Sequence, residues 1–384
     1  MSASTLASAA QVWQAAVELG LGGLERLRPE WEALCAERGG AALLLQPAWV
    51  RAHVEALEAP SGLELHTMRR DGQLRAVLPL LRERVWFCGV PAVRLRAAAG
   101  VYSVRFDLLA GPGEEGQAAA DALAGSISGR RGWDVLELRD VPAGGVAEHL
   151  VAALAARGHA TGRWLALQSP YVEMAAGEGL PAGFGSTSKK FRNQLAQGRR
   201  GLEAEFGPIH LERLDWRNGE ELAARLDRFY AFEHAGWKGR NGSSILARPG
   251  ARDFYDRAAA AMAAQGKLAL HCLRAGDHLL AMGYGLQDSE AFYVLKWSYD
   301  EAFAKHGPGH LLIESMLLEL GGVQPPLARF DITGGDEPYK QKWTKARLDH
   351  SYLFAFRRGP RGALLRSLKF TWTPWVKKML RKPA

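Results

Sequence analysis

Cysteine is scarce in this chain of 384 residues: three are present, far apart, at Cys35, Cys88 and Cys272. An odd number at this spacing predicts neither a disulfide framework nor a zinc cluster. No stretch reaches the roughly 18–20 consecutive apolar residues that cross a bilayer, and the first segment lacks the basic start and compact apolar run of a signal peptide. We therefore expect a cytoplasmic protein without a transmembrane segment.

Acidic residues are absent from Ser351 to the end of the chain, where nine Lys or Arg are interleaved with aromatic residues. The formal net charge of +8 thus has a local source. Such a segment can contact anionic lipid, a polyanionic substrate or nucleic acid; alternatively, it is a basic helix that covers the last strand. We treat residues 356–384 as a basic tail able to contact the inner membrane face. No nucleic-acid partner is expected, because no recognition motif for one is present.

An internal repeat organises the chain. Residues 63–76 (LELHTMRRDGQLRA) and 268–281 (LALHCLRAGDHLLA) share six of fourteen positions. Each reads as a strand, a tight turn at Asp71-Gly72 or Gly276-Asp277, and a second strand. Chance similarity between two hairpins is the alternative to a true repeat.

The order of elements after the two hairpins is repeated as well. Gly111-Pro112-Gly113 and Gly307-Pro308-Gly309 each begin a helical stretch, and an apolar strand with acidic residues follows. The apolar fraction of 47% and charged fraction of 23% are typical of globular proteins. We predict two tandem α/β modules, residues 1–165 and 166–355, each with a mixed, mostly antiparallel sheet flanked by helices.

The two Gly-Pro-Gly turns differ in charge. Glu114-Glu115 follows the first turn and complements the helix dipole. After the second turn no acid occurs before Glu314, so the N–H groups of residues 309–311 would point outward from an electropositive helix start. Such a start binds anions, most often phosphate; a water-capped surface helix is the alternative.

The second half is expected to hold helices at about 185–204, 218–234 and 250–264, and strands at 209–214, 291–297 and 328–332. Four motifs occur in it in a fixed order, SKKFRNQL, EHAGWKG, LKWSYDEAFAKHGPGHLL and FDITGGDEPYKQKW. Together they resemble tandem GNAT-fold acyltransferases of the cellulose-biosynthesis or BioF2-like type, relatives of the Fem aminoacyltransferases. The resemblance covers roughly residues 40–355 and is most specific over 185–345.

The resemblance implies roles for particular residues. The turn that would hold the pyrophosphate of acetyl-CoA or another acyl-CoA comprises His306, Gly307, Pro308, Gly309, His310 and Leu311. It is shorter than the usual Gln/Arg-x-x-Gly-x-Gly/Ala turn of GNAT enzymes and contains a proline. Arg192 matches an arginine that faces substrate phosphates in Fem relatives, and the other substrate-binding positions are Trp237, Lys238 and Lys296. Asp331, Tyr339 and Lys340 match the acid and the Tyr-Lys pair near the end of the second half.

These residues suffice for direct acyl transfer from a thioester. Asp331 would be the base or would orient the acceptor, Tyr339 the acid, and Lys340 or Lys296 the electrostatic stabiliser. Plainer alternatives exist: a carboxylate that caps a turn, a core tyrosine, and lysines at a strand edge. His306 and His310 have the i,i+4 spacing of metal ligands, but a proline separates them and no third ligand is near, so no metal is expected.

Three functions remain open from the sequence. The first is an acyl-CoA-dependent N- or O-acyltransferase acting on a sugar, a polysaccharide precursor or a small amine. The second is a Fem-like aminoacyltransferase acting on a cell-envelope precursor. The third is a catalytically silent GNAT-like protein recruited to a membrane or polyanion by its tail. The acceptor and the oligomeric state are not encoded in any motif of this sequence.

Overall fold

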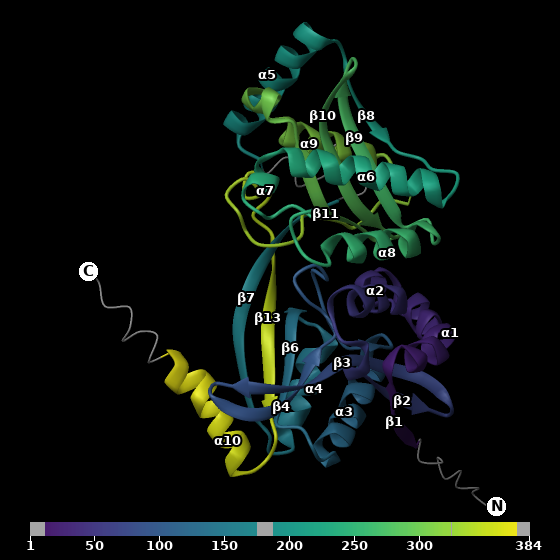
Figure 1. Cartoon of the computed structure of the whole chain (residues 1–384), viewed down its shortest axis with the longest axis vertical. Coiled ribbons are helices and arrows are strands. Elements are labelled where there is room, and N and C mark those ends of the chain that lie inside the picture. Colours follow the sequence, from purple (N-terminus) through teal and green to yellow (C-terminus); the bar gives the residue numbers. More distant parts are fainter. Residues whose placement is uncertain (1–11, 175–186, 324, 375–384) are drawn as a thin grey trace, which may run out of the picture.

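The computed structural model describes residues 12–174, 187–323 and 325–374. Within them, thirteen strands form one mixed sheet that runs through both halves of the chain, with helices on both faces (Figure 1). The order along the sheet is β1-β2-β3-β4-β6-β13-β7-β12-β11-β10-β9-β8, and β5 pairs with β3. The predicted α/β class with a mostly antiparallel sheet is confirmed, since only the pairs β4–β6 and β11–β12 are parallel in the described part.

The first half begins with β1 and ends before β7. Its strands are β1 (Trp13–Leu19), β2 (Leu63–Arg70), β3 (Gln73–Phe87), β4 (Val90–Ala97), β5 (Leu109–Ala110) and β6 (Val135–Pro142). Its helices are α1 (Gly20–Arg38), α2 (Pro47–Leu57), α3 (Gly113–Gly129) and α4 (Val146–Ala156), with a 3-10 segment at Gly39–Leu45. The first predicted hairpin is therefore β2–β3, and the first Gly-Pro-Gly turn leads into α3.

Between residues 209 and 331 the second half follows much the same order of elements as the first half from β1 to β6. Its strands are β7 (Ala160–Glu173), β8 (Ile209–Arg213), β9 (Leu268–Ala275), β10 (His278–Gln287), β11 (Ala291–Tyr299), β12 (Arg329–Asp331) and β13 (Arg347–Phe356). Its helices are α5 (Lys189–Phe206), α6 (Gly219–Ala235), α7 (Trp237–Arg240), α8 (Ala251–Ala263), α9 (Pro308–Gly321) and α10 (Pro360–Ser367). Every element expected between residues 185 and 332 is present, with ends within a few residues of the prediction. Strands β7 and β13 were not predicted.

Two long strands join the halves. Ten of the first eleven residues of β7 pair with β13, and its last three pair with β12. β13 lies between β7 and β6, so the chain returns to complete the sheet of the first half (Figure 1). The division predicted between residues 165 and 166 falls inside β7. Packing joins the halves too: Trp49 of α2 lies edge-to-face on Phe254 of α8, with ring centroids 5.1 Å apart.

The described part of the basic tail covers the last strand. Leu365 of α10 is fully buried, and the ring of Phe370 lies 5.4 Å from Trp164 and 5.5 Å from Phe354. The ammonium of Lys369 lies 4.8 Å from the Trp164 ring, where a cation–π contact is favourable. The basic residues from Lys377 onward are outside the described residues. No described helix combines the length and the apolar character needed to span a bilayer.

Candidate functional site

The two parallel strands β11 and β12 diverge soon after they pair. Their ladder joins Ala291–Tyr293 to Arg329–Asp331 and then stops, although β11 continues to Tyr299. After Asp331 the chain turns away, with positive φ at Thr333 and Gly334. The Thr333 hydroxyl donates to the Val294 carbonyl at 2.5 Å, which closes the ladder. A space is thus left between β11, the turn after β12 and the start of α9.

This space is a cavity of about 530 Å³. It combines an aromatic wall with three lysines, and no Asp or Glu is among the described residues that line it. Eight of the predicted site residues line it: Trp237, Lys238, Lys296, Gly307, Gly309, His310, Tyr339 and Lys340. They come from segments more than 100 residues apart, so the fold gathers residues that the sequence grouped only by motif.

Two of the three lysines are already bound. Lys238 donates to the Glu233 carboxylate at 2.9 Å and to the Trp297 carbonyl at 2.6 Å. Lys340 donates to the carbonyls of Thr333 at 2.7 Å and Gly335 at 3.2 Å, and it pairs with Glu337 at 2.7 Å. All its donors are therefore used within the turn after β12. Lys340 thus holds that turn in place, and its role as electrostatic stabiliser stays a prediction.

Lys296 is the lysine that remains available. Its ammonium has no hydrogen-bond or ion-pair partner among the described residues, and its nearest aromatic neighbour is the Tyr255 ring at 5.8 Å. Burial lowers the pKa of Lys296 below its ordinary value, although the Glu233 carboxylate opposes that shift. An unpaired, partly desolvated cation interacts strongly with any negative charge that develops beside it.

Tyr339 lies against the aromatic wall. Its ring contacts Trp297 edge-to-face, with centroids 5.8 Å apart. Burial raises the pKa of the Tyr339 hydroxyl, and the Glu337 carboxylate adds to this rise. The hydroxyl therefore keeps its proton throughout the physiological range. It could transfer this proton only to a leaving group that is more basic than the Tyr339 phenolate.

The start of α9 offers fewer free donors than the sequence predicted. Gly307 is the N-cap, with φ of 67°, and Pro308 is the first helical residue. The N–H groups of His310 and Leu311 both donate to the Gly307 carbonyl, at 2.9 and 3.1 Å. Only Gly309 keeps an N–H without a backbone acceptor in the described part. The prediction of three outward donors is wrong, because the tight turn satisfies two of them internally.

His310 has a fixed tautomer in the cavity wall. Trp343 donates its indole N–H to Nδ1 of His310 at 3.2 Å. Since an indole N–H can only donate, the proton of the neutral ring is on Nε2. Burial lowers the pKa of His310 to about 4, and nearby Lys342 contributes. His310 is thus a neutral hydrogen-bond donor at neutral pH.

Asp331 does not line the cavity. It is fully buried, and Arg105 of the first half donates to its Oδ2 at 2.7 Å. Its Oδ1 accepts from the Thr333 N–H at 3.0 Å. Both carboxylate oxygens of Asp331 are therefore occupied by contacts within the protein. Asp331 thus joins the two halves through Arg105, and its role as base or as orienter of the acceptor stays a prediction.

The other predicted residues lie outside the cavity lining. Arg192 donates to the Thr187 backbone and side chain within its own helix start. Leu311 and Pro308 are buried in the packing of α9. His306 faces α5, where only a glycine fits: a Cβ at Gly198 would lie 2.2 Å from the His306 carbonyl oxygen. The structure thus separates Arg192 and His306 from the residues of the cavity.

Glu233 is not among the residues that the sequence predicts for the site. It is fully buried, and both oxygens are bound, one by Lys238 and the other by the Ile245 N–H at 2.8 Å. It fixes Lys238 in the wall and supplies the negative charge nearest to Lys296. A glutamate at helical spacing from WKG in the EHAGWKG motif was the available signal; sequence alone could not show that it is buried.

Comparison with known families identifies this region. Residues 189–341 match the model of the acetyltransferase (GNAT) domain. The match contains all the predicted site residues and every described residue of the cavity lining except Trp343. This part of the chain is therefore similar to the acetyltransferase (GNAT) domain. No curated protein matches the chain in sequence.

Solved structures extend the likeness to the whole chain. FemX superposes with a TM-score of 0.56 at 12% sequence identity, covering 89% of this chain and 98% of FemX. The C-terminal domain of a putative lysylphosphatidylglycerol synthetase from Agrobacterium fabrum has a TM-score of 0.50 at 12% identity, covering 89% of this chain and 95% of that domain. At such identities the likeness concerns the fold.

Proposed function

We propose that this protein transfers an acyl group from an acyl-CoA to an amine or hydroxyl of a sugar, a polysaccharide precursor or a small amine. The observation that carries the proposal is the cavity where β11 and β12 diverge, with the unpaired ammonium of Lys296 in its wall. A site that accumulates negative charge on a carbonyl oxygen needs such a cation, placed before the reaction begins.

The proposed reaction is a direct attack on the thioester carbonyl. The acceptor nitrogen or oxygen bonds to the carbonyl carbon and releases its proton to solvent water, and Lys296 with the Nε2–H of His310 stabilises the resulting oxyanion. When the carbon–sulfur bond breaks, the Tyr339 hydroxyl donates a hydrogen bond to the thiolate, which takes its proton from solvent because a thiolate is less basic than a tyrosinate. Trp237 and Trp297 form the apolar wall that limits water around the acyl group.

A different donor is the second candidate. The start of α9 has one free N–H, at Gly309, and two that are bonded internally. That turn is a poor match for a pyrophosphate, and this observation favours a Fem-like donor such as an aminoacyl ester. The names of FemX and of a lysylphosphatidylglycerol synthetase fit that alternative, with a cell-envelope precursor or a lipid headgroup as acceptor.

The deciding experiment uses Lys296→Met and its matched control Lys345→Met, which removes an exposed lysine outside the cavity lining. Acetyl-CoA and longer acyl-CoAs are titrated by calorimetry, and release of free thiol is followed with a panel of amines and sugars. We expect Lys296→Met to lower transfer by roughly 10²–10³-fold and Lys345→Met to leave it unchanged.

Two results would count against the proposal. Full acyl transfer by the Lys296→Met variant would show that Lys296 does not stabilise the oxyanion. Absence of acyl-CoA binding in the wild-type protein, with transfer from an aminoacyl ester, would establish the Fem-like donor instead. If neither donor binds, the protein is a silent GNAT-like binding protein, for which membrane contact through the basic tail would be the function to test.

A further inference from the structure

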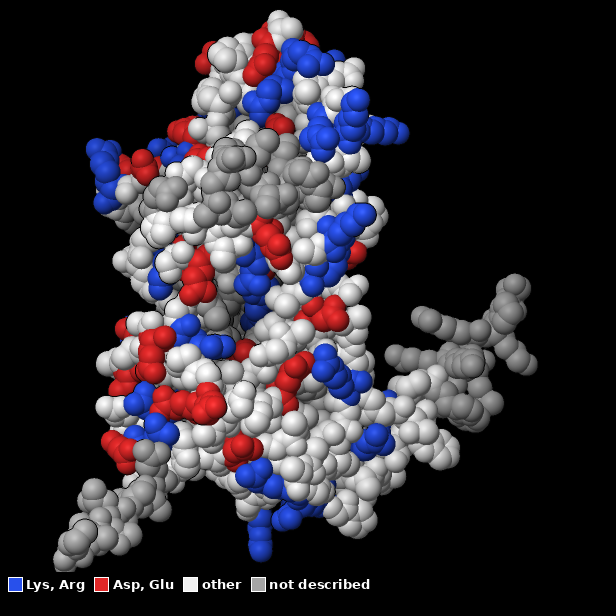
Figure 2. Space-filling model, turned by 180° about the vertical axis from the view of Figure 1, so that it is seen from behind, with Lys and Arg blue, Asp and Glu red and all other residues white. Residues whose placement is uncertain are grey.

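A second cavity, of about 190 Å³, lies where the two halves meet. The first half contributes Arg38 at the end of α1, Arg105, Asp107 and the turn at residues 142–145. The second half contributes Tyr293 of β11 and Arg329 of β12. Figure 2 shows basic side chains along the hollow between the upper and lower parts of the molecule.

The arginines of this cavity have donors left over. Arg38 has neither a hydrogen bond nor an ion pair among the described residues. Arg105 uses its Nη2 on Asp331, but its Nε is buried without a partner. The Nε of Arg329 is also buried without a hydrogen-bond partner and lies 3.7 Å from Asp331. Buried donors of this kind are rare unless a ligand or an ordered water accepts from them.

The acids near the cavity do not satisfy these donors. Asp331 lies behind the lining and is shared between Arg105 and Arg329. Asp107 lines the cavity, but its oxygens already accept from the N–H groups of Leu108 and Ala147, at 2.8 and 2.7 Å, and of Val146 at 3.0 Å. Three guanidinium groups thus face two carboxylates, which leaves one positive charge uncompensated.

We propose that this cavity binds a small oxyanion, a phosphate or a carboxylate group, held by Arg38, Arg105 and Arg329. Guanidinium groups suit both ligands, because their planar N–H donors match the spacing of oxyanion oxygens. The ligand is either a free anion or the anionic group of a larger molecule. Since both halves contribute donors, the bound anion bridges them and stabilises the folded chain.

Thermal unfolding tests this site with inorganic phosphate as the probe, against sodium chloride at matched ionic strength. We expect the midpoint to rise with the logarithm of the phosphate concentration above the dissociation constant. Arg38→Gln should lose this rise. Arg26→Gln, which removes an arginine of the same helix outside the cavity, should keep it. Lys296→Met should also keep it, because the site is separate from the proposed transfer cavity.

Acetate and glycerol phosphate in parallel arms distinguish the sources. A shift with phosphate or acetate indicates a free anion, whereas a shift with glycerol phosphate alone indicates the anionic group of a larger ligand. An Arg38→Gln midpoint equal to that of the wild type in chloride shows that the variant is folded. The proposal is overturned if no arm exceeds the chloride control, or if Arg38→Gln responds as strongly as the wild type.

Discussion

The starts of α3 and α9 show how one module has been used in two ways. Both helices follow a Gly-Pro-Gly turn. In α3, Glu114 and Glu115 occupy the first turn, and Glu115 pairs with Arg70 at 2.5 Å. In α9 the same positions hold His310 and Leu311, and no acid lies in the first turn. The first helix start is neutralised from within, whereas the second faces a cavity.

The parallel strands beside these two helices differ in how far they continue past their ladders. β4 pairs in parallel with β6 over Arg94–Arg96 and Val135–Glu137, the same three-residue ladder that joins β11 to β12. β4 ends one residue later, at Ala97, whereas β11 continues for six. The second half has a cavity beyond its parallel ladder, whereas polar contacts fill the corresponding region of the first half.

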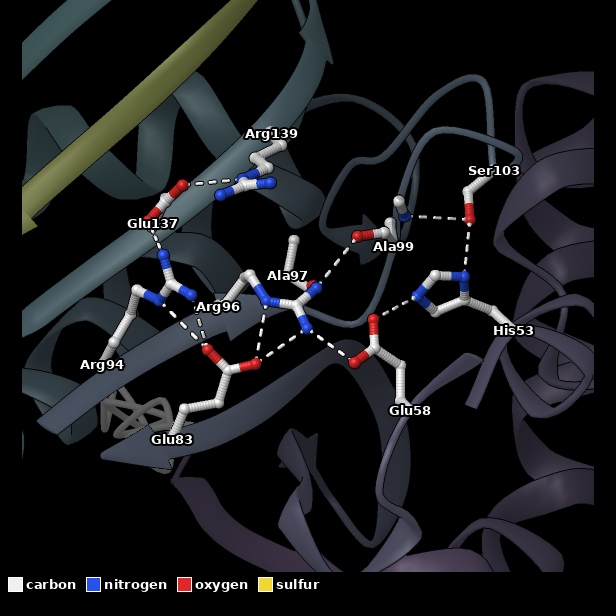
Figure 3. Close-up of polar contacts among 11 residues, drawn as sticks. His53, Glu58, Glu83, Arg94, Arg96, Ala97, Ala99, Ser103, Glu137 and Arg139 are labelled. Atoms are coloured by element: carbon white, nitrogen blue, oxygen red, sulfur yellow. Dashed lines mark hydrogen bonds and ion pairs between the residues drawn. The ribbon is translucent and has the colours of Figure 1, made fainter. Parts of the chain in front are cut away.

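Arg96 is at the centre of these contacts (Figure 3). It donates to the carbonyls of Ala97 at 3.3 Å and Ala99 at 3.2 Å, and it pairs with Glu58 and Glu83, each at 2.8 Å. These contacts fix the loop that follows β4 in the first half.

Glu137 in the first half and Asp331 in the second half are equivalent, since each is the last residue of its ladder. The largest expected loss of stability tests how these two carboxylates are held. Glu137 has two arginine partners, Arg94 at 2.8 Å and Arg139 at 2.6 Å, whereas Asp331 has one close partner, Arg105. Arg105→Met leaves a fully buried carboxylate without its close partner, so we expect a loss of about 3–5 kcal/mol in the free energy of unfolding. Urea denaturation measures it.

Arg139→Met is the matched control in the first half. Glu137 keeps Arg94 there, and Arg139 is partly exposed, so a loss of about 1 kcal/mol or less is expected. If the two variants lose equal stability, Asp331 is not held chiefly by Arg105. Its role in joining the two halves through Arg105 would then be wrong, and the predicted role as base or orienter would be the better explanation.

The sequence predicted what depends on local patterns. The hairpins at 63–76 and 268–281 and the helix after each Gly-Pro-Gly turn follow from residue periodicity and turn chemistry. β13 could not be placed, because its partners β6 and β7 lie far away in the sequence. For the same reason the sequence could not tell Lys296 from Lys340. Both are cations near one cavity, and only tertiary contacts show that one is fully bound and the other free.

Transplanting the charge of α3 into α9 is the second test. His310→Glu places a carboxylate where Glu114 lies in the first half. If the proposed transfer cavity binds an anionic donor such as acyl-CoA, we expect at least about a tenfold weaker affinity, or 1.4 kcal/mol, because like charges repel at the helix start. Calorimetric titration measures the dissociation constant.

His310→Gln controls for loss of the imidazole without adding charge. It should weaken binding less than His310→Glu does. Equal weakening by both variants would mean that the ring, and not the electropositive helix start, holds the donor.

The smallest effect concerns the acid sensitivity of α9. The pKa of His310 is about 4 in the folded chain, below the value of about 6.5 for an unfolded histidine. Between these values the unfolded state binds more protons, so stability falls as the pH drops from 6.5 towards 4. For a partly buried ring we expect the His310 contribution to be about 1 kcal/mol between pH 7 and pH 5.

Urea denaturation at pH 7, 6 and 5 checks this contribution, with His310→Gln as the variant that cannot titrate. His350 has a folded pKa of about 4 as well, so the wild type and His310→Gln should both lose stability, the variant less steeply. Identical slopes for the wild type and His310→Gln would show that the imidazole is not desolvated at the cavity. The assignment of His310 as a neutral hydrogen-bond donor would then be wrong.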